Sequence, residues 1–126
     1  MGTSGISEAA ERLVHQHIDS VEQLEVLLLL HRTAPRAWGA ADVAHDLRID
    51  QSSSKRRLED LVSRGMVTRD GEGFSYRPSA HDASVRALSD AYRERRVAVI
   101  TLIFTKPSDP VRELADAFRI NKKGGS

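Results

Sequence analysis

The chain has 126 residues, the usual length of one compact domain, and its 40% hydrophobic and 29% charged residues are typical of a globular protein. It contains no cysteine, which excludes disulfides, thiol catalysis and thiolate metal sites. The net charge is only +1, so the overall charge gives no indication of a nucleic acid partner. Residues 1–5 lack a basic segment followed by an apolar run, and the longest apolar run, residues 26–30, is far too short to span a bilayer. We therefore expect a cytoplasmic protein.

The charges are unevenly distributed along the chain. Residues 1–30 contain one basic and five acidic side chains, whereas residues 48–69 contain six basic and three acidic ones. A local basic patch of this kind attracts phosphates even when the whole chain is nearly neutral.

The first half of the chain is predicted to be helical. Apolar side chains at spacings of three and four predict a helix over residues 7–18. Ser20 with Gln23 three residues later can form a capping box that starts a second helix. Residues 26–30 are apolar on every face, so this helix is expected to be covered on more than one side, either as the central helix of the core or as part of a dimer interface. Pro35 ends it.

A compact group of short elements follows. Residues 36–39 can form a short extended segment, and residues 40–47 a short helix. A tight turn at residues 48–50 leads to Asp50, which is placed to cap a helix over residues 51–64, and Gly65 is expected to end that helix in the left-handed conformation. Ser54 stands on the inner face where an aliphatic side chain would be usual, so we expect loose packing there.

A hairpin comes next. Residues 66–69 and 74–77 alternate apolar and polar side chains, and residues 70–73 (Asp-Gly-Glu-Gly) supply the turn between them. Pro78 ends the second strand.

The pattern after the hairpin predicts one long helix over residues 81–105. Residues 97–104 are rich in β-branched side chains and would also suit a strand, but no turn signal separates them from the helical pattern before them. Asp109 and Pro110 then start a last helix that runs to about residue 120. We divide the chain into a helical extension (residues 1–19), a central domain (20–79), a C-terminal helical region (80–121) and a flexible tail (122–126).

Two short helices joined by a tight turn and followed by a two-stranded hairpin define a winged helix-turn-helix, so the predicted fold is mainly α with a small β-hairpin. The pattern resembles bacterial winged-helix transcription regulators of the multiple-antibiotic-resistance-regulator-like superfamily over residues 38–77. The residues that carry the resemblance are Leu58, Leu61, Gly65, Met66 and Val67. It implies a regulator that binds double-stranded DNA.

The residue types at the start of the third short helix suit this function. A helix fits the major groove of B-DNA, Gln can pair with adenine and Arg or Lys with guanine, and hydroxyls and free N–H groups at a helix start suit phosphate oxygens. The predicted DNA contacts are Gln51, Ser52, Ser53, Lys55, Arg56, Arg57, Arg69 and Arg77. Two alternatives remain open: the basic residues form only the solvated face of a helix, or the fold serves as a protein-interaction module that does not bind DNA. The acidic wing tip, Asp70 and Glu72, favours the second alternative.

The apolar C-terminal region predicts a homodimer, because a small domain cannot bury all of these side chains itself. The predicted dimerisation residues are Val97, Ile100, Leu102, Ile103, Phe104, Leu114 and Phe118. The alternative is a helix that folds back over the protomer's own core, and attachment to a membrane surface is the least favoured interpretation.

No enzyme is predicted, and no metal or other cofactor. The five histidines lack partners at the spacing that a metal site needs, and neither a nucleophile elbow nor a phosphate-binding glycine loop occurs. A small-molecule effector between the winged domain and the last helices is a further possibility, with Trp38, Tyr76, Tyr92 and Phe104 as candidate lining residues, although each also suits a core position.

Overall fold

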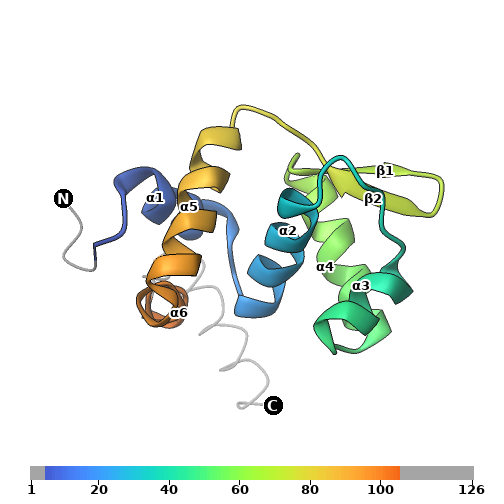
Figure 1. Ribbon diagram of the computed structural model, residues 1–126, viewed down its shortest axis with the longest axis horizontal. Helices are drawn as coiled ribbons and strands as arrows, with labels where there is room; N and C mark the ends of the chain where they lie inside the picture. Colours follow the sequence, from blue (N-terminus) through green and yellow to red (C-terminus); the bar gives the residue numbers. More distant parts are fainter. Residues whose placement is uncertain (1–4, 106–126) are drawn as a thin grey trace, which may run out of the picture.

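The structure is a computed structural model that describes residues 5–105, in which six helices and one antiparallel hairpin follow one another. The elements are α1 (Glu8–His17), α2 (Val21–Arg32), α3 (Ala40–Leu47), α4 (Gln51–Ser63), β1 (Val67–Asp70), β2 (Gly73–Tyr76), α5 (Asp82–Glu94) and α6 (Arg96–Thr105). Figure 1 shows α1, α5 and α6 on one side of the molecule and α3, α4 and the hairpin on the other, with α2 between them. Among the described residues no helix is both long and apolar enough to cross a membrane.

Helix α2 is the centre of the core, as its uniformly apolar sequence predicts. Residues 26–30 are all buried, and α2 packs against α4, β2 and α3, while a hydrogen bond from Tyr92 of α5 reaches its Glu25. The Ser20 hydroxyl caps the helix by accepting the Gln23 N–H at 3.0 Å. The Gln23 side chain, however, accepts the N–H of Asp19 at 2.6 Å instead of that of Ser20, so the reciprocal half of the capping box is shifted by one residue.

The ends of α4 follow the sequence prediction. The Asp50 carboxylate accepts the N–H groups of Ser52 and Ser53 at 3.0 and 3.3 Å. Gly65 has φ +81°, which confirms the left-handed stop after the helix. The turn before α4 contains Arg48, also in the left-handed region with φ 59°.

Ser54 corrects the expectation of loose packing. Its side chain is completely buried, and its hydroxyl donates to the carbonyl oxygen of Ala40 at 2.9 Å. A small polar residue therefore lets the first turns of α3 and α4 approach closely and joins them by a hydrogen bond.

The hairpin pairs Val67 with Tyr76 and Asp70 with Gly73, so each strand lies one residue away from its predicted bounds. The two-residue turn is made by Gly71, with φ +63°, and Glu72. The predicted short segment at residues 36–39 is reduced to a single bridge, in which Trp38 and Phe74 exchange two backbone hydrogen bonds of 2.7 and 2.8 Å.

The prediction of one continuous helix over residues 81–105 is wrong. Arg95, with φ −139° and ψ 57°, separates α5 from α6, which runs in a different direction (Figure 1). The bend brings Val99 and Ile103 into the core, and Gly5 lies against the bend so closely that a Cβ there would be 2.7 Å from Arg95 Nε. The predicted last helix, with Leu114 and Phe118, lies outside the described residues.

Candidate nucleic-acid interface

The first two turns of α4 present polar and basic side chains to solvent. Gln51, Ser52, Lys55 and Arg56 are exposed, and Ser53 is half-buried. Their exposure follows from the helical period, because Ser54, Leu58 and Leu61 occupy the buried face of the same helix. A duplex that approached this end of α4 would meet an amide, an ammonium and a guanidinium group within two turns.

The cap of α4 changes the role expected of its serines. The Ser52 hydroxyl and the N–H groups of Ser52 and Ser53 all donate to Asp50, and these hydrogen bonds, with that from the Ser52 hydroxyl first, lower the pKa of the Asp50 carboxyl. Asp50 thus remains charged and occupies the donors that were expected to meet a phosphate. The expectation that Ser52 and Ser53 bind phosphate is weakened, and Arg56 itself lies near the cap, where its Nη2 donates to the Ser53 hydroxyl at 3.4 Å.

Two of the other predicted arginines are engaged in ion pairs. Arg57 Nε lies 2.9 Å from Glu22 Oε1 on α2. Arg69 lies 3.4 Å from Glu59 on α4 and donates to the carbonyl oxygen of Gly71 at 3.2 Å. Arg77 is exposed where β2 ends. Partly exposed ion pairs contribute only about 0–1 kcal/mol, so a phosphate could compete for Arg57 and Arg69.

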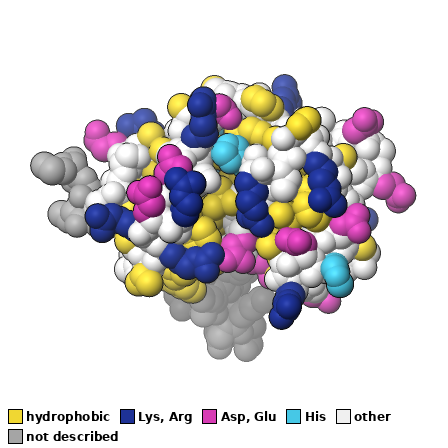
Figure 2. All heavy atoms as spheres, viewed as in Figure 1, with side chains coloured by type: hydrophobic (Ala, Val, Ile, Leu, Met, Phe, Trp, Pro, Cys, Tyr) yellow, Lys and Arg dark blue, Asp and Glu magenta, His cyan; other side chains and the backbone are white. Residues whose placement is uncertain are grey.

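A hollow of about 280 Å³ lies where α3, α4 and the hairpin meet. Its lining residues are Gly39, Ala40, Ala41, Gln51, Lys55, Arg69, Glu72 and Phe74. It brings Lys55 and Arg69 to one surface, although they are fourteen positions apart in sequence, but it places acidic Glu72 beside them. Figure 2 shows acidic side chains at the end of the molecule where the hairpin lies, so the wing tip repels a phosphate backbone.

The predicted dimerisation residues of α6 separate into two groups. Val97 and Phe104 are 76% and 79% exposed, and Ile100 and Leu102 are half-buried. Ile103 is buried in the protomer's own core and is therefore unavailable to a partner. One side of α6 therefore covers the core, as the fold-back alternative predicts, whereas the other side faces solvent, and dimerisation through it stays a prediction.

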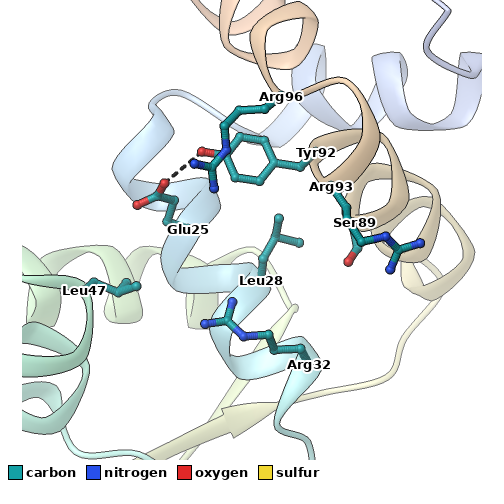
Figure 3. A pocket seen from close by; sticks show the side chains of 8 residues that line it. All are labelled: Glu25, Leu28, Arg32, Leu47, Ser89, Tyr92, Arg93 and Arg96. Carbon is teal, nitrogen blue, oxygen red and sulfur yellow. Dashed lines mark hydrogen bonds between the residues drawn. The ribbon is translucent and has the colours of Figure 1, made fainter.

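A larger cavity of about 530 Å³ lies between the two sides of the molecule (Figure 3). Glu25, Leu28 and Arg32 of α2, Leu47 of α3, Ser89, Tyr92 and Arg93 of α5, and Arg96 of α6 line it. The Tyr92 hydroxyl donates to Glu25 at 2.8 Å, and the Arg96 guanidinium lies 4.6 Å from the Tyr92 ring centre. Burial, helped by the bond to Glu25, raises the pKa of Tyr92 to about 12, so the phenol stays protonated.

Three of the four predicted effector-lining aromatics lie elsewhere. Trp38 is buried and donates from Nε1 to Thr33, Tyr76 is buried and donates to Asp82, and Phe104 faces solvent. Only Tyr92 lines the cavity. The sequence analysis did not identify the three arginines of this cavity, Arg32, Arg93 and Arg96, for which the basic run at residues 93–96 was the available signal.

The histidines form ring contacts. The rings of His17 and His81 are 4.7 Å apart, and those of His31 and Tyr76 are 4.9 Å apart. Within residues 5–105, no three acidic or histidine side chains gather in a way that could hold a metal ion.

Comparisons with known proteins bear on the fold. No protein-family model matches the sequence, and a search of curated proteins found no match. The structure is similar to MepR, a transcription regulator of the Staphylococcus aureus multidrug efflux pump MepA, with a TM-score of 0.54 and 15% identity over 94% of this chain and 88% of that chain. It is also similar to a multiple antibiotic-resistance repressor (MarR) from Listeria monocytogenes, with a TM-score of 0.51 and 20% identity over 93% and 80% of the two chains. The chain therefore has the winged helix-turn-helix fold of MarR-type transcription regulators.

Proposed function

We propose that this protein is a transcription regulator that binds duplex DNA through α4, as a homodimer. The observation that carries the proposal is the exposed group of Gln51, Lys55 and Arg56 on the first two turns of α4. In a winged helix these turns enter the major groove, where a glutamine can pair with adenine and a basic side chain with guanine.

The arginines around α4 would contribute contacts to the DNA backbone. Arg77 is exposed beside the hairpin, and Arg57 and Arg69 could exchange their surface carboxylates for phosphates. The short acidic wing argues for major-groove contacts over deep insertion of the wing into a minor groove. Such a small set of charges predicts modest affinity per protomer, which a dimer on paired half-sites would raise.

The proposal is tested on the DNA upstream of the protein's own gene, with the double variant Lys55→Ala, Arg56→Ala. Loss of two groove contacts, each worth about 1–3 kcal/mol, should weaken binding at least about tenfold. Binding of the wild type should weaken steeply as the salt concentration rises, because its phosphate contacts release counterions. Arg12→Ala, an exposed change on α1, is the matched control and should leave affinity unchanged. Equal affinities for the double variant and the wild type would refute the assigned role of α4.

The alternative is a winged-helix interaction module that does not bind DNA. The ion pairs of Arg57 and Arg69 and the acidic wing tip motivate it, since all three reduce the positive potential near α4. Under this alternative the wild-type protein would bind its upstream DNA no better than an unrelated duplex at the same salt concentration.

A second candidate function is the binding of a small organic anion in the cavity of Figure 3. The cavity has a volume typical of ligand sites, about 300–1,000 Å³. Its lining contains three arginines and one glutamate, and Leu28, Leu47 and the Tyr92 ring supply an apolar surface. Because helices from both sides of the molecule line the cavity, its occupant could change the orientation of the two sides relative to each other.

A further inference from the structure

A polar junction, buried at its centre and partly exposed at its charged edge, lies where the link between α1 and α2 meets the C-terminal end of α4. Its centre is Gln23, which is 1% exposed. The Gln23 Nε2 group donates to the carbonyl oxygen of His17 at 3.1 Å and to Asp60 Oδ2 at 2.6 Å, while Oε1 accepts the N–H of Asp19 at 2.6 Å. One side chain of α2 therefore holds the end of α1, the following link and a carboxylate of α4.

Arg64, the residue that ends α4, completes this junction. Its Nε lies 2.9 Å from Asp60 Oδ2, and its Nη2 lies 2.9 Å from Asp19 Oδ2. Its Nη1 also donates to the carbonyl oxygen of Gln16, in the last turn of α1, at 3.5 Å. A guanidinium can serve these partners at once because its donors point in fixed, divergent directions.

The junction connects two sets of helices with different partners. Helix α1 packs against α5 and α6, which carry the outward surface of Val97 and Phe104. Helix α4 packs against α2, α3 and β1. The backbone between α1 and α2 is not helical over residues 18–20, and the bonds of Gln23 and Arg64 add to the restriction that burial of Ile18 places on it.

The length of α4 makes this restriction important. The helix has 13 residues and is therefore about 20 Å long. Arg64 lies at one end, whereas Gln51 lies at the other. A rotation of about 10° at the junction would move the DNA-contacting turns by roughly 3.5 Å, which is about one base-pair step.

We propose that Arg64 is a positioning residue. By bridging Asp19 and Asp60 it sets the orientation of α4 relative to α1, and thereby the separation of half-sites that a dimer reads. The proposal of half-site separation rests on the proposed function, whereas the orientation of α4 can be measured without DNA.

The first experiment measures that orientation directly. Because the chain has no cysteine, the double variant Arg12→Cys, Lys55→Cys introduces two labels, on the exposed surfaces of α1 and α4. Labelled protein is mixed with excess unlabelled protein, so that pulsed electron paramagnetic resonance reports the distance within one chain. Arg64→Gln should broaden or shift the distance distribution by several ångströms, and Asp19→Asn should do so to a smaller extent.

The matched control is Arg86→Gln, because the carboxylate that Arg86 contacts, Asp82, belongs to its own helix and Arg86 lies outside the cavity of Figure 3. This variant should leave the distribution unchanged. Circular dichroism establishes that each variant is folded, and Asp19→Asn keeps the test decisive if Arg64→Gln does not fold. An unchanged distribution in a folded Arg64→Gln or Asp19→Asn protein would overturn the proposal.

The second experiment selects DNA from a pool in which the spacer between two half-sites varies in length. Arg64→Gln should shift or widen the preferred spacer by one base pair or more, while the base preference within each half-site stays the same. Arg64→Lys should restore the preference only in part, since an ammonium lacks the guanidinium fork. Equal weakening at every spacer would indicate a purely structural role and overturn the positioning proposal. If the wild type selects no DNA, the proposed function fails, and the distance measurement alone decides the orientation.

Discussion

His17 contacts the start of α5 through its side chain and α2 through its backbone. Its ring contacts that of His81, at the start of α5, and its carbonyl oxygen accepts from Gln23. Burial is the largest of the effects that lower its pKa below the ordinary value of 6.5, followed by His81 and Arg64, while Asp19 and Asp60 act in the opposite direction. The neutral imidazole is therefore the form that suits the folded protein.

This predicts a loss of stability in mildly acidic solution. Between the ordinary pKa and the lowered pKa of the folded state, the unfolded chain binds more protons at this residue than the folded chain does. The contribution of His17 is thus fully present above pH 6.5 and is lost as the pH falls through this interval. Urea unfolding from about pH 7.5 to about pH 5 should show a flatter profile for His17→Gln than for the wild type.

The control for this measurement is His15→Gln, because His15 is an exposed histidine on the same helix. It should retain the wild-type profile. If His17→Gln lost stability with falling pH as steeply as the wild type does, another group would have to be responsible.

At Ser54, a buried hydrogen bond overturned the prediction of loose packing that the serine side chain had suggested. A serine among leucines suggested a gap, but a completely buried hydroxyl with a carbonyl partner is satisfied and leaves none. The partner, Ala40, is fourteen positions away, so no local pattern could have identified it.

At the scale of elements, the two sides of α6 differ in their exposure to solvent. Val99 and Ile103 are buried, whereas Val97 and Phe104 face solvent on the opposite side. Large exposed apolar groups on one side of a helix are typical of a contact surface. The break at Arg95 creates this arrangement, and neither glycine nor proline marks it in the sequence.

We predict that Val97→Glu with Phe104→Glu gives a folded monomer. The substitutions remove apolar contact and place like charges across a twofold interface, while in the protomer they replace exposed groups, which usually changes stability by less than about 0.5 kcal/mol. Sedimentation velocity measures the oligomeric state. Ala41→Glu, an exposed change on α3, should leave the dimer intact, and a wild-type monomer would show that α6 does not dimerise the chain.

At the scale of the whole molecule, the cavity between α2, α5 and α6 occupies the boundary of the two helical layers. The Tyr92 to Glu25 hydrogen bond crosses that boundary, and Arg96 covers the same ring (Figure 3). An anion bound to the arginines would add attractive contacts from both layers. Such a ligand stabilises the folded state in proportion to the logarithm of its concentration over its dissociation constant.

We therefore predict that an aromatic carboxylate such as benzoate raises the melting temperature of the wild type. The double variant Arg32→Gln, Arg96→Gln should lose most of this rise, because it removes two of the three cationic groups of the cavity. Arg12→Gln, outside the cavity, serves as the control for nonspecific anion effects. Equal rises in all three proteins would exclude the cavity as the binding site.

The sequence by itself determined the winged helix and its ends. The Asp50 cap, the Gly65 stop and the apolar spacing of α4 act within a few residues, so a linear pattern contains them. The exposure of Gln51, Lys55 and Arg56 follows from the same helical period. The exposure of the candidate site residues was therefore predictable where the environment of each side chain depends on its own helix.

Only the tertiary structure decided the rest, because these features depend on residues far apart in the chain. The ion pairs of Arg57 with Glu22 and of Arg69 with Glu59 determine how much positive charge α4 can offer. The bend at Arg95 depends on packing against the core, and the junction at Arg64 joins groups up to 48 positions apart. Local propensity specifies where a helix begins and ends, whereas long-range packing specifies which of its faces remain free to bind.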